Sequence, residues 1–280
     1  MTSPHPANAQ PNDGMQPTGS LTGPALSAVA GATPIDLPIR GGAYTRAPGE
    51  LLAAMKGVSS ATASATLHKM GVRRTFLQGP VPLRRGSSAV GSALTLQFMP
   101  QREDVASGDS QEYAERTSAL WAVLEAAESG DMLVIQANGD KITGCVGEML
   151  ASNLAGKGGA GAVVDGCVRD LPKLLAMDLP IWAVGATPNY ASQSGQFPWA
   201  YDVPISCGST LVLPGDVIIA DDDGAVVVPQ SLAPEVLRRS QQVNEWESFA
   251  RMRIDGGGAL SKYYPLDDAA TVEYETWRRG

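Results

Sequence analysis

Histidine and cysteine are scarce: the 280 residues include two histidines, His5 and His68, and three cysteines. His5 lies in a proline-rich stretch, so a Ser-His-Asp or Cys-His catalytic group would have to use His68, which we expect on a helix as a partly buried structural residue. Cys145, Cys167 and Cys207 form no C-x-x-C pair, which argues against a zinc site or a disulfide framework. We expect small buried thiols in a reducing, cytoplasmic setting.

Long apolar runs and an excess of positive charge are also absent. No stretch of about 18 apolar residues occurs, so we expect no membrane-spanning helix. The chain has 21 Lys and Arg against 29 Asp and Glu, a formal net charge of −8. This balance does not suit binding to nucleic-acid phosphates. It fits a small-molecule enzyme and an acidic protein-binding surface equally well.

The N-terminal segment differs in composition from the rest. Residues 1–39 contain no Lys or Arg and seven of the 20 prolines, and such a segment buries too little apolar surface to offset its ordering entropy. We therefore expect a disordered arm over residues 1–46 and a folded domain over 47–229. Residues 230–280 should form a long helix from Leu232 to Arg253 and a tail whose aromatic residues dock on the core or on a neighbouring subunit.

Helical and strand patterns alternate through the middle of the chain. We expect helices over 48–58, 59–71, 110–130, 147–158 and 170–178. Strands are expected over 89–99, 130–139, 141–146, 161–168 and 180–185, and residues 203–229 should form three or four strands joined by tight turns. These patterns alone predict an α/β protein with a β-rich second half.

Two conspicuous motifs have simple structural explanations. GKGGAG, residues 156–161, matches G-x-G-x-x-G, but a dinucleotide fingerprint follows a strand and opens a helix. These glycines instead close a helix and lead into a strand, which predicts a helix end and a loop. ADDDG, residues 220–224, lies between two apolar runs and predicts a hairpin turn, although three adjacent acids could also bind a cation weakly.

Arg169 and Asp170 follow the strand expected over 161–168. Ligands bind at the carboxyl ends of strands in open α/β sheets, which makes this pair a candidate site. Asp170 could instead be a helix N-cap, with Pro172 in the first turn and Arg169 a surface charge. Glu148 has a similar alternative, as an acid that the helix dipole favours in a first turn.

The spacing of these residues resembles that in the RraA-like family. Twenty residues separate Glu148 from Arg169, and DGCVRD, PGDVIIADDDGAVVVP and ESFARMR add to the similarity. That family contains class II pyruvate aldolases acting on 4-hydroxy-4-methyl-2-oxoglutarate and 4-carboxy-4-hydroxy-2-oxoadipate, and also protein inhibitors of ribonuclease E. The aldolases carry Asp at the position of Glu148. The resemblance covers roughly residues 59–264.

The resemblance implies a fold, an assembly and a reaction. The fold is an αββα sandwich with a swivelling-domain-like core and a mixed sheet, assembled as a homotrimer or homohexamer with sites between subunits. The reaction is metal-dependent retro-aldol cleavage of a 4-hydroxy-2-oxo acid through pyruvate enolate. Oxaloacetate decarboxylation, which passes through the same enolate, is expected as a side activity.

Residue roles also follow from the resemblance. Asp170 would hold Mg²⁺ or Mn²⁺, with Glu247 of an adjacent subunit in the outer shell of the metal. Arg169 would bind the 2-oxo acid and stabilise developing charge, and Glu148 would hold the water that carries the proton.

The main chain of Gly147, Met149 and Leu150 would receive the substrate carboxylate. The expected ligand is a small 2-oxo acid, with no nucleic acid or membrane as partner. Two alternatives stay open: a non-catalytic regulator of ribonuclease E or another partner, and a related 2-oxo acid decarboxylase or hydratase.

Overall fold

The computed structural model describes residues 35–102, 118–191 and 195–279. Its centre is a large sheet in which five strands lie side by side: β7 (Gln196–Tyr201), β3 (Ala89–Pro100), β4 (Asp131–Gly144), β5 (Gly161–Val168) and β6 (Ile181–Ala186). The strands from β3 to β6 run parallel, whereas β7 runs antiparallel to β3. The short strands β1 (Ile39–Arg40) and β2 (Val81–Pro82) pair with β7 and β6 at the edges. The predicted α/β class with a mixed sheet is confirmed.

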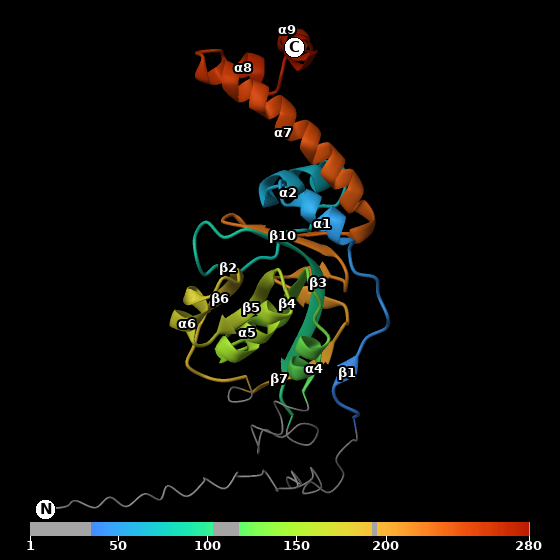
Figure 1. The fold of residues 1–280 in the computed structure, drawn as a ribbon, viewed down its shortest axis with the longest axis vertical. Coiled ribbons are helices and arrows are strands. Elements are labelled where there is room, and N and C mark those ends of the chain that lie inside the picture. Colours follow the sequence, from blue (N-terminus) through green and yellow to red (C-terminus); the bar gives the residue numbers. More distant parts are fainter. Residues whose placement is uncertain (1–34, 103–117, 192–194, 280) are drawn as a thin grey trace, which may run out of the picture.

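Strand β3 is long enough to pair with strands in both β layers. Residues 92–97 pair with β4, whereas residues 89–92 pair with β10 (Val217–Asp221), which forms a hairpin with β11 (Gly224–Val228). A second hairpin joins β8 (Ile205–Cys207) and β9 (Thr210–Val212). Helices α4 (Ala119–Glu125), α5 (Glu148–Gly156) and α6 (Leu171–Ala176) cover the central sheet. Helices α1 (Gly49–Met55), α2 (Ser60–Lys69) and α7 (Ala233–Asp255) cover the β10–β11 hairpin, which completes four αββα layers (Figure 1).

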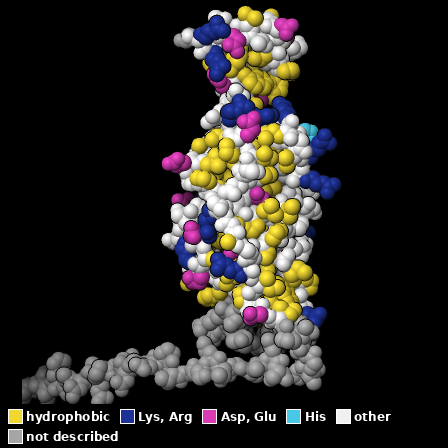
Figure 2. Space-filling view, turned by 90° about the vertical axis from the view of Figure 1, so that its right-hand side faces the viewer, with side chains coloured by type: hydrophobic (Ala, Val, Ile, Leu, Met, Phe, Trp, Pro, Cys, Tyr) yellow, Lys and Arg dark blue, Asp and Glu magenta, His cyan; other side chains and the backbone are white. Residues whose placement is uncertain are grey.

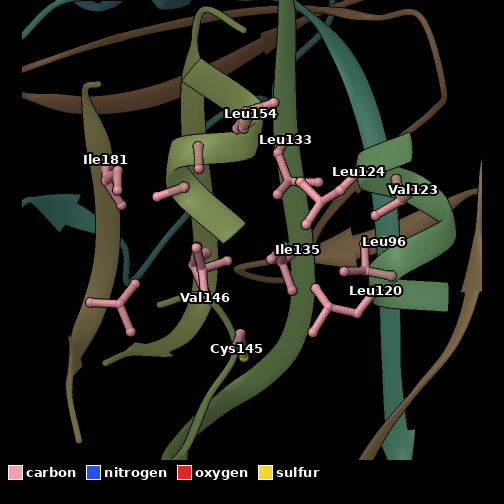
Figure 3. Packing of buried hydrophobic residues seen from close by; sticks show 14 of the residues in the cluster. Leu96, Leu120, Val123, Leu124, Leu133, Ile135, Cys145, Val146, Leu154 and Ile181 are labelled. Carbon is pink, nitrogen blue, oxygen red and sulfur yellow. The ribbon is translucent and has the colours of Figure 1, made fainter. Parts of the chain in front are cut away.

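Three apolar clusters fill the spaces between these layers, because successive side chains on a strand point to opposite faces. On β4, Leu133 packs toward α4 and α5, whereas its neighbour Val134 packs toward the hairpins. On β10, Ile218 faces the central sheet and Ile219 faces α1, α2 and α7. Figure 3 shows the first cluster, in which Leu154 of α5 lies over Leu133. The core therefore holds α5 and its neighbouring turns firmly against the sheet.

Three expected elements differ from the structure. The separate strands expected over 130–139 and 141–146 form one strand, β4, because Asn138 and Gly139 at φ 55° and 69° bend it without ending it. The unpredicted strand β7 carries Pro198, which lies opposite Phe98 where the pairing with β3 shifts register, an irregularity that tolerates proline. Of the helix expected over 110–130, the described part runs from Ala119 to Glu125, and residues 103–117 lie outside the described residues.

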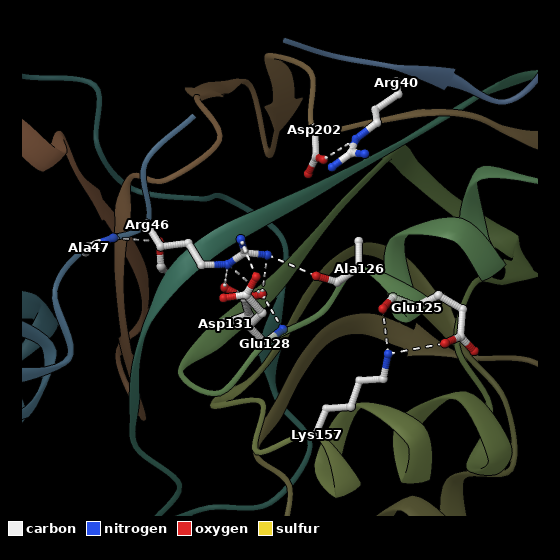
Figure 4. Close-up of polar contacts among 10 residues, drawn as sticks. Arg40, Arg46, Ala47, Glu125, Ala126, Glu128, Asp131, Lys157 and Asp202 are labelled. Atoms are coloured by element: carbon white, nitrogen blue, oxygen red, sulfur yellow. Dashed lines mark hydrogen bonds and ion pairs between the residues drawn. The ribbon is translucent and has the colours of Figure 1, made fainter. Parts of the chain in front are cut away.

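The arm expected over residues 1–46 lies partly within the described residues, and its boundary at residue 47 stays a prediction. Residues 1–34 lie outside the described residues, whereas β1 pairs with β7 and Arg46 contacts the start of β4. Nε of Arg46 donates a hydrogen bond to Asp131 at 2.9 Å, and Nη2 donates to the carbonyl oxygen of Ala126 at 3.0 Å (Figure 4). The Asp131 side chain is 1% exposed, so this ion pair holds the segment that contains Arg46 to the buried start of β4.

The C-terminal part extends away from the sandwich. Helix α7 follows a short 3-10 turn (Gln230–Leu232) and carries α8 (Leu260–Tyr263) and α9 (Asp268–Arg279) at its far end (Figure 1). Phe249, Tyr263 and Ala270 are buried there among further aromatic side chains. Hydrophobic side chains also reach the surface at this end and on the body (Figure 2). Within one chain the aromatic tail packs on α7, and docking on a neighbouring subunit stays a prediction. None of the described helices is long and apolar enough to cross a membrane.

Substitution of Arg46 should destabilise the protein strongly. Arg46→Met leaves the buried Asp131 carboxylate without its cation, which we expect to lower the free energy of unfolding by about 3 kcal/mol. Urea unfolding followed by tryptophan fluorescence measures this change. The matched control is Arg84→Met, since Arg84 pairs at 3.7 Å with Asp178 and both side chains are exposed; its cost should stay below about 1 kcal/mol. Equal costs would contradict the anchoring role of Arg46.

Candidate functional site

Arg169 and Asp170 lie in the turn between β5 and α6, at the carboxyl end of the strand. Asp170 occupies the N-cap position of α6 with φ 59° and ψ 34°, a left-handed conformation, and its side chain makes no capping hydrogen bond to that helix. Its Oδ2 instead accepts hydrogen bonds from the main-chain N–H of Glu148, at 3.2 Å, and from Nε of Arg169, at 3.3 Å. The N-cap explanation accounts for the position of Asp170 but not for its side chain.

Two glycines make room for this contact. Gly147 is the N-cap of α5, and a Cβ there would lie 2.7 Å from Oδ2 of Asp170 and 2.9 Å from Cγ of Arg169. A Cβ at Gly144, the last residue of β4, would lie 3.1 Å from Cβ of Arg169 and would also collide with the main chain at Asn189. A side chain at either position would therefore push the β5–α6 turn away from α5.

The first turn of α5 supplies main-chain donors. The N–H groups at the start of an α-helix have no carbonyl one turn back to accept their hydrogen bonds. In α5 the N–H of Glu148 is used by Asp170, which leaves those of Met149 and Leu150. These donors and the positive end of the helix dipole suit a ligand carboxylate.

The Asp170 carboxylate is held in its ionised form. The hydrogen bond from the N–H of Glu148, and then the Arg169 guanidinium, lower the pKa of Asp170 despite partial burial. Its side chain is 33% exposed, and Oδ1 accepts no hydrogen bond from the described residues. An ionised carboxylate with an unpaired oxygen suits Mg²⁺ or Mn²⁺, since hard cations of this size keep several waters and need few protein ligands. The described part of the chain contains no group of three or more His, Cys, Asp or Glu that could hold a metal, so the cation would rest on this one carboxylate.

The carboxylate of Glu148 points away from this contact. It forms a short ion pair with Nζ of Lys173, the third residue of α6. The same pairing raises the pKa of Lys173, first through the hydrogen bond and then through the charge of Glu148. The Lys173 side chain is 62% exposed and that of Glu148 35% exposed. Glu148 is thus brought next to Asp170 by its main chain, while its side chain binds the neighbouring helix.

A cavity of about 320 Å³ opens beside the pair. Its polar end is made by Arg169, Asp170 and the main chain of Gly147. The remaining walls are mostly apolar and come from α4, from the first turn of α5 and from the segment after β6, with the lining side chains Leu120, Trp121, Met149, Leu150, Tyr190 and Ala191. The cavity therefore combines one charged pair with a mostly apolar lining.

The α4 side of this cavity was not predicted. Leu120 is 2% exposed and serves the core, as its place in Figure 3 shows, whereas its neighbour Trp121 is 37% exposed. An exposed tryptophan next to a buried leucine on an amphipathic helix is the signal that could have identified this wall. The turn that carries Tyr190 has no such signal, because only the packing of β6 beside β5 brings it to the site.

Other candidate residues lie elsewhere. Glu247 sits on α7, beyond the β10–β11 hairpin from the cavity, and accepts a hydrogen bond from the Tyr264 hydroxyl at 3.2 Å (Figure 1). Within one chain it does not reach Asp170. His68 is exposed on α2 rather than partly buried. The three cysteines are free and buried as expected, and burial raises the pKa of the Cys145 thiol.

Both glycine-rich and acidic motifs are structural, as predicted. GKGGAG closes α5 and leads into β5. ADDDG forms the turn between β10 and β11, where Asp221 pairs with Gly224. The side chain of Asp221 accepts hydrogen bonds from the N–H of Ser60 at 2.8 Å and from its hydroxyl at 2.6 Å, and that of Asp222 accepts from the N–H of Gly86 at 2.9 Å. Asp221 and Asp222 thus connect the β10–β11 turn to the start of α2 and to the loop at Gly86.

Comparisons with known proteins agree with this architecture. The model of the RraA-like family, described as Aldolase/RraA, matches residues 56–227. The chain belongs to this family. A protein of Halalkalibacterium halodurans named "Putative 4-hydroxy-4-methyl-2-oxoglutarate aldolase" is 35% identical over 161 residues, which cover 58% of this chain and 69% of that protein.

Solved structures add to the comparison. The crystal structure of Streptomyces coelicolor RraAS2, described as an unusual member of the RNase ES inhibitor RraA protein family, is 52% identical with a TM-score of 0.69. The match covers 75% of this chain and all of that one. A protein of Pseudomonas syringae pv. tomato shares the fold at 24% identity, with a TM-score of 0.66 over 79% of this chain. The family thus includes proteins with an aldolase name and proteins with a regulator name.

Gly147→Ala should disturb the site and destabilise the fold. The added Cβ overlaps Asp170 and Arg169, and relief of the overlap should cost about 1–3 kcal/mol of unfolding free energy. The matched control is Gly156→Ala at the other end of α5, where an added Cβ meets no atom within 4 Å; that change should be neutral or stabilise by up to about 1 kcal/mol. Thermal and urea unfolding of both variants measure the difference, and equal stability would contradict the close approach at Gly147.

Proposed function

We propose that this protein is a divalent-metal-dependent lyase that cleaves a 4-hydroxy-2-oxo acid by a retro-aldol reaction. One observation carries the proposal: the Asp170 carboxylate, the Arg169 guanidinium and the first turn of α5 line one cavity. These groups match the needs of a 2-oxo acid, which carries a carboxylate and an adjacent keto oxygen. Membership of the Aldolase/RraA family supports it.

Each group has a distinct task. The N–H groups of Met149 and Leu150 would bind the substrate carboxylate. Arg169, whose planar guanidinium is always charged, would bind the keto oxygen and stabilise the negative charge that develops on it. Asp170 would hold Mg²⁺ or Mn²⁺, which when bound supplies Lewis acidity toward the same oxygens.

The reaction requires one proton to leave and another to arrive. The 4-hydroxyl loses its proton, the C3–C4 bond breaks, and C4 becomes a carbonyl. The electron pair of that bond forms the enolate of pyruvate, which then takes a proton at C3. Glu148 would hold the water that carries these protons, and for this task its carboxylate must leave Lys173, to which it is bound in the structure.

A neighbouring subunit would complete the site. Glu247 lies on α7, apart from Asp170 in the same chain, so its proposed place in the outer shell of the metal needs a second copy of the chain. We propose a homotrimer or homohexamer on this ground. The extended α7–α9 end, with its own buried aromatic cluster, provides a rigid element that can reach such a neighbour.

A second function, regulation of a ribonuclease, is favoured by the 52% identity to RraAS2, whose description places it in an RNase inhibitor family. The net charge of −8 would suit a basic protein partner. Such a regulator would not need Arg169 and Asp170 beside the main-chain N–H groups at the start of α5. A 2-oxo acid decarboxylase or hydratase would use the same polar groups and differs from the lyase in its substrate and in the bond that breaks or forms.

The enzyme should release pyruvate from oxaloacetate when Mg²⁺ or Mn²⁺ is added, and EDTA should abolish the activity. Asp170→Asn and Arg169→Ala should each lower kcat/KM by about a hundredfold or more, because each removes a group that stabilises developing charge. Lactate dehydrogenase coupling measures the pyruvate. As a readout independent of turnover, Mg²⁺ with a 2-oxo acid should raise the melting temperature of the wild type but not of Asp170→Asn. A regulator without catalysis would release no pyruvate and show no such shift.

The role of Glu148 is tested by Glu148→Gln. We expect kcat to fall by about a hundredfold or more with little change in KM, since proton transfer acts in the transition state. Lys173→Met is the matched variant: it removes the same ion pair but keeps the carboxylate, so its kcat should fall far less. Equal losses in the two variants would assign the effect to the ion pair and remove Glu148 from proton transfer.

A further inference from the structure

The walls of the cavity restrict which substrate it can take. At the polar end, Arg169 is the one cationic side chain among the described lining residues. Lys173 lies nearby on α6, but its amine is bound to Glu148 and it does not line the cavity. A single carboxylate with its neighbouring keto oxygen therefore occupies all the positive charge that the described lining offers.

Most of the remaining lining is apolar. Trp121 of α4 and Met149 and Leu150 of α5 line the cavity, and Met149 is 76% exposed. Leu120 and Ala191, both buried, line it as well. A second carboxylate placed among these side chains would lose its hydration without gaining a partner, whereas an alkyl chain or ring would gain from leaving water.

From this contrast we infer that the substrate carries one carboxylate, bound at the Arg169 end, and an uncharged apolar substituent beyond C4, which Trp121, Met149 and Leu150 receive. The inference rests on the proposed lyase function and adds the substrate class. Dicarboxylic 4-hydroxy-2-oxo acids are then poor substrates. The cavity volume of about 320 Å³ leaves space for such a substituent after the three-carbon pyruvate part is placed.

A matched substrate pair tests the inference. 4-Hydroxy-2-oxoheptanoate and 4-hydroxy-2-oxoheptane-1,7-dioate differ only at C7, which is a methyl group in one and a carboxylate in the other. Both release one pyruvate and one aldehyde, so pyruvate coupling counts turnovers equally and the bond that breaks is the same. We expect kcat/KM to be at least about tenfold higher for the heptanoate, the discrimination that apolar contacts of this size provide.

Met149→Lys places a cation at the apolar rim and should reduce this ratio by about tenfold or reverse it. Leu211→Lys is the charge-matched control, because Leu211 is 63% exposed on β9, away from the cavity; it should keep the wild-type ratio. The two kcat/KM values of each variant are measured on the same preparation. An unfolded fraction therefore cancels in their ratio.

The outcomes separate the two proposals. Pyruvate release from oxaloacetate together with equal or faster cleavage of the heptanedioate would overturn the apolar substrate class and leave the lyase function standing. If Met149→Lys keeps the wild-type ratio of the two kcat/KM values, Met149 does not contact the substituent beyond C4. Absence of pyruvate from oxaloacetate and from both heptanoates, with Mg²⁺ and Mn²⁺ present, would overturn the lyase function itself. A preference for the heptanoate that Met149→Lys weakens would support both.

Discussion

The hydrogen bond from the main-chain N–H of Glu148 to the carboxylate of Asp170 joins two turns that belong to neighbouring strands. Parallel pairing of β4 with β5 brings the carboxyl ends of the strands to one edge of the sheet. Main-chain hydrogen bonds from Cys145 to Cys167, at 2.8 Å, and from Arg169 to Val146, at 2.9 Å, continue this pairing into the turns. The Asp170 contact adds a side-chain link between the second turn and the start of α5. It combines a charged acceptor with the positive end of a helix, which makes it stronger than a bond between neutral groups.

This contact imposes demands on the residues around it. Gly147 must lack a side chain, and Asp170 must adopt a left-handed conformation that costs a residue with a Cβ about 1 kcal/mol. Asp202 and Asn138 also have positive φ, yet Asp202 is bound to Arg40 at 3.3 Å, in a structural pair away from the cavity. Positive φ alone therefore does not mark a site. At Asp170 it coincides with the cavity, which Asp202 does not line.

Much of the fold could be predicted from the sequence, because short runs rich in valine and isoleucine, such as residues 161–168, 217–220 and 225–228, favour buried strands. The α/β class and the hairpin at residues 220–224 followed from these runs and from turn residues. Strand β7 could not be predicted, since Pro198 in its middle argues against a strand, and the irregular pairing with β3 that tolerates this proline is visible only in three dimensions.

The candidate site, too, could be predicted from the sequence only in part. Arg169, Asp170 and the start of α5 could be located from spacing, because a strand and the following turn place them locally. Trp121 could be singled out as a tryptophan on the outer face of an amphipathic helix, but its place beside the cavity could not, since that depends on how α4 packs beside α5 across β3 and β4. The side chain of Glu148 shows a further limit: its position in the chain is compatible with several partners, and the nearby Lys173 on α6 decides among them.

The charges at the polar end imply that ligands bind there in a coupled manner. Arg169 and Asp170 contribute charges of opposite sign, so by themselves they attract an anion only weakly. A divalent cation on Asp170 would add two positive charges next to the helix donors and so favour a carboxylate strongly. Because coupling between two ligands is reciprocal, a 2-oxo acid must increase the affinity for the cation by the same factor. One exposed carboxylate could then hold the metal, since the substrate and waters would supply further oxygen ligands.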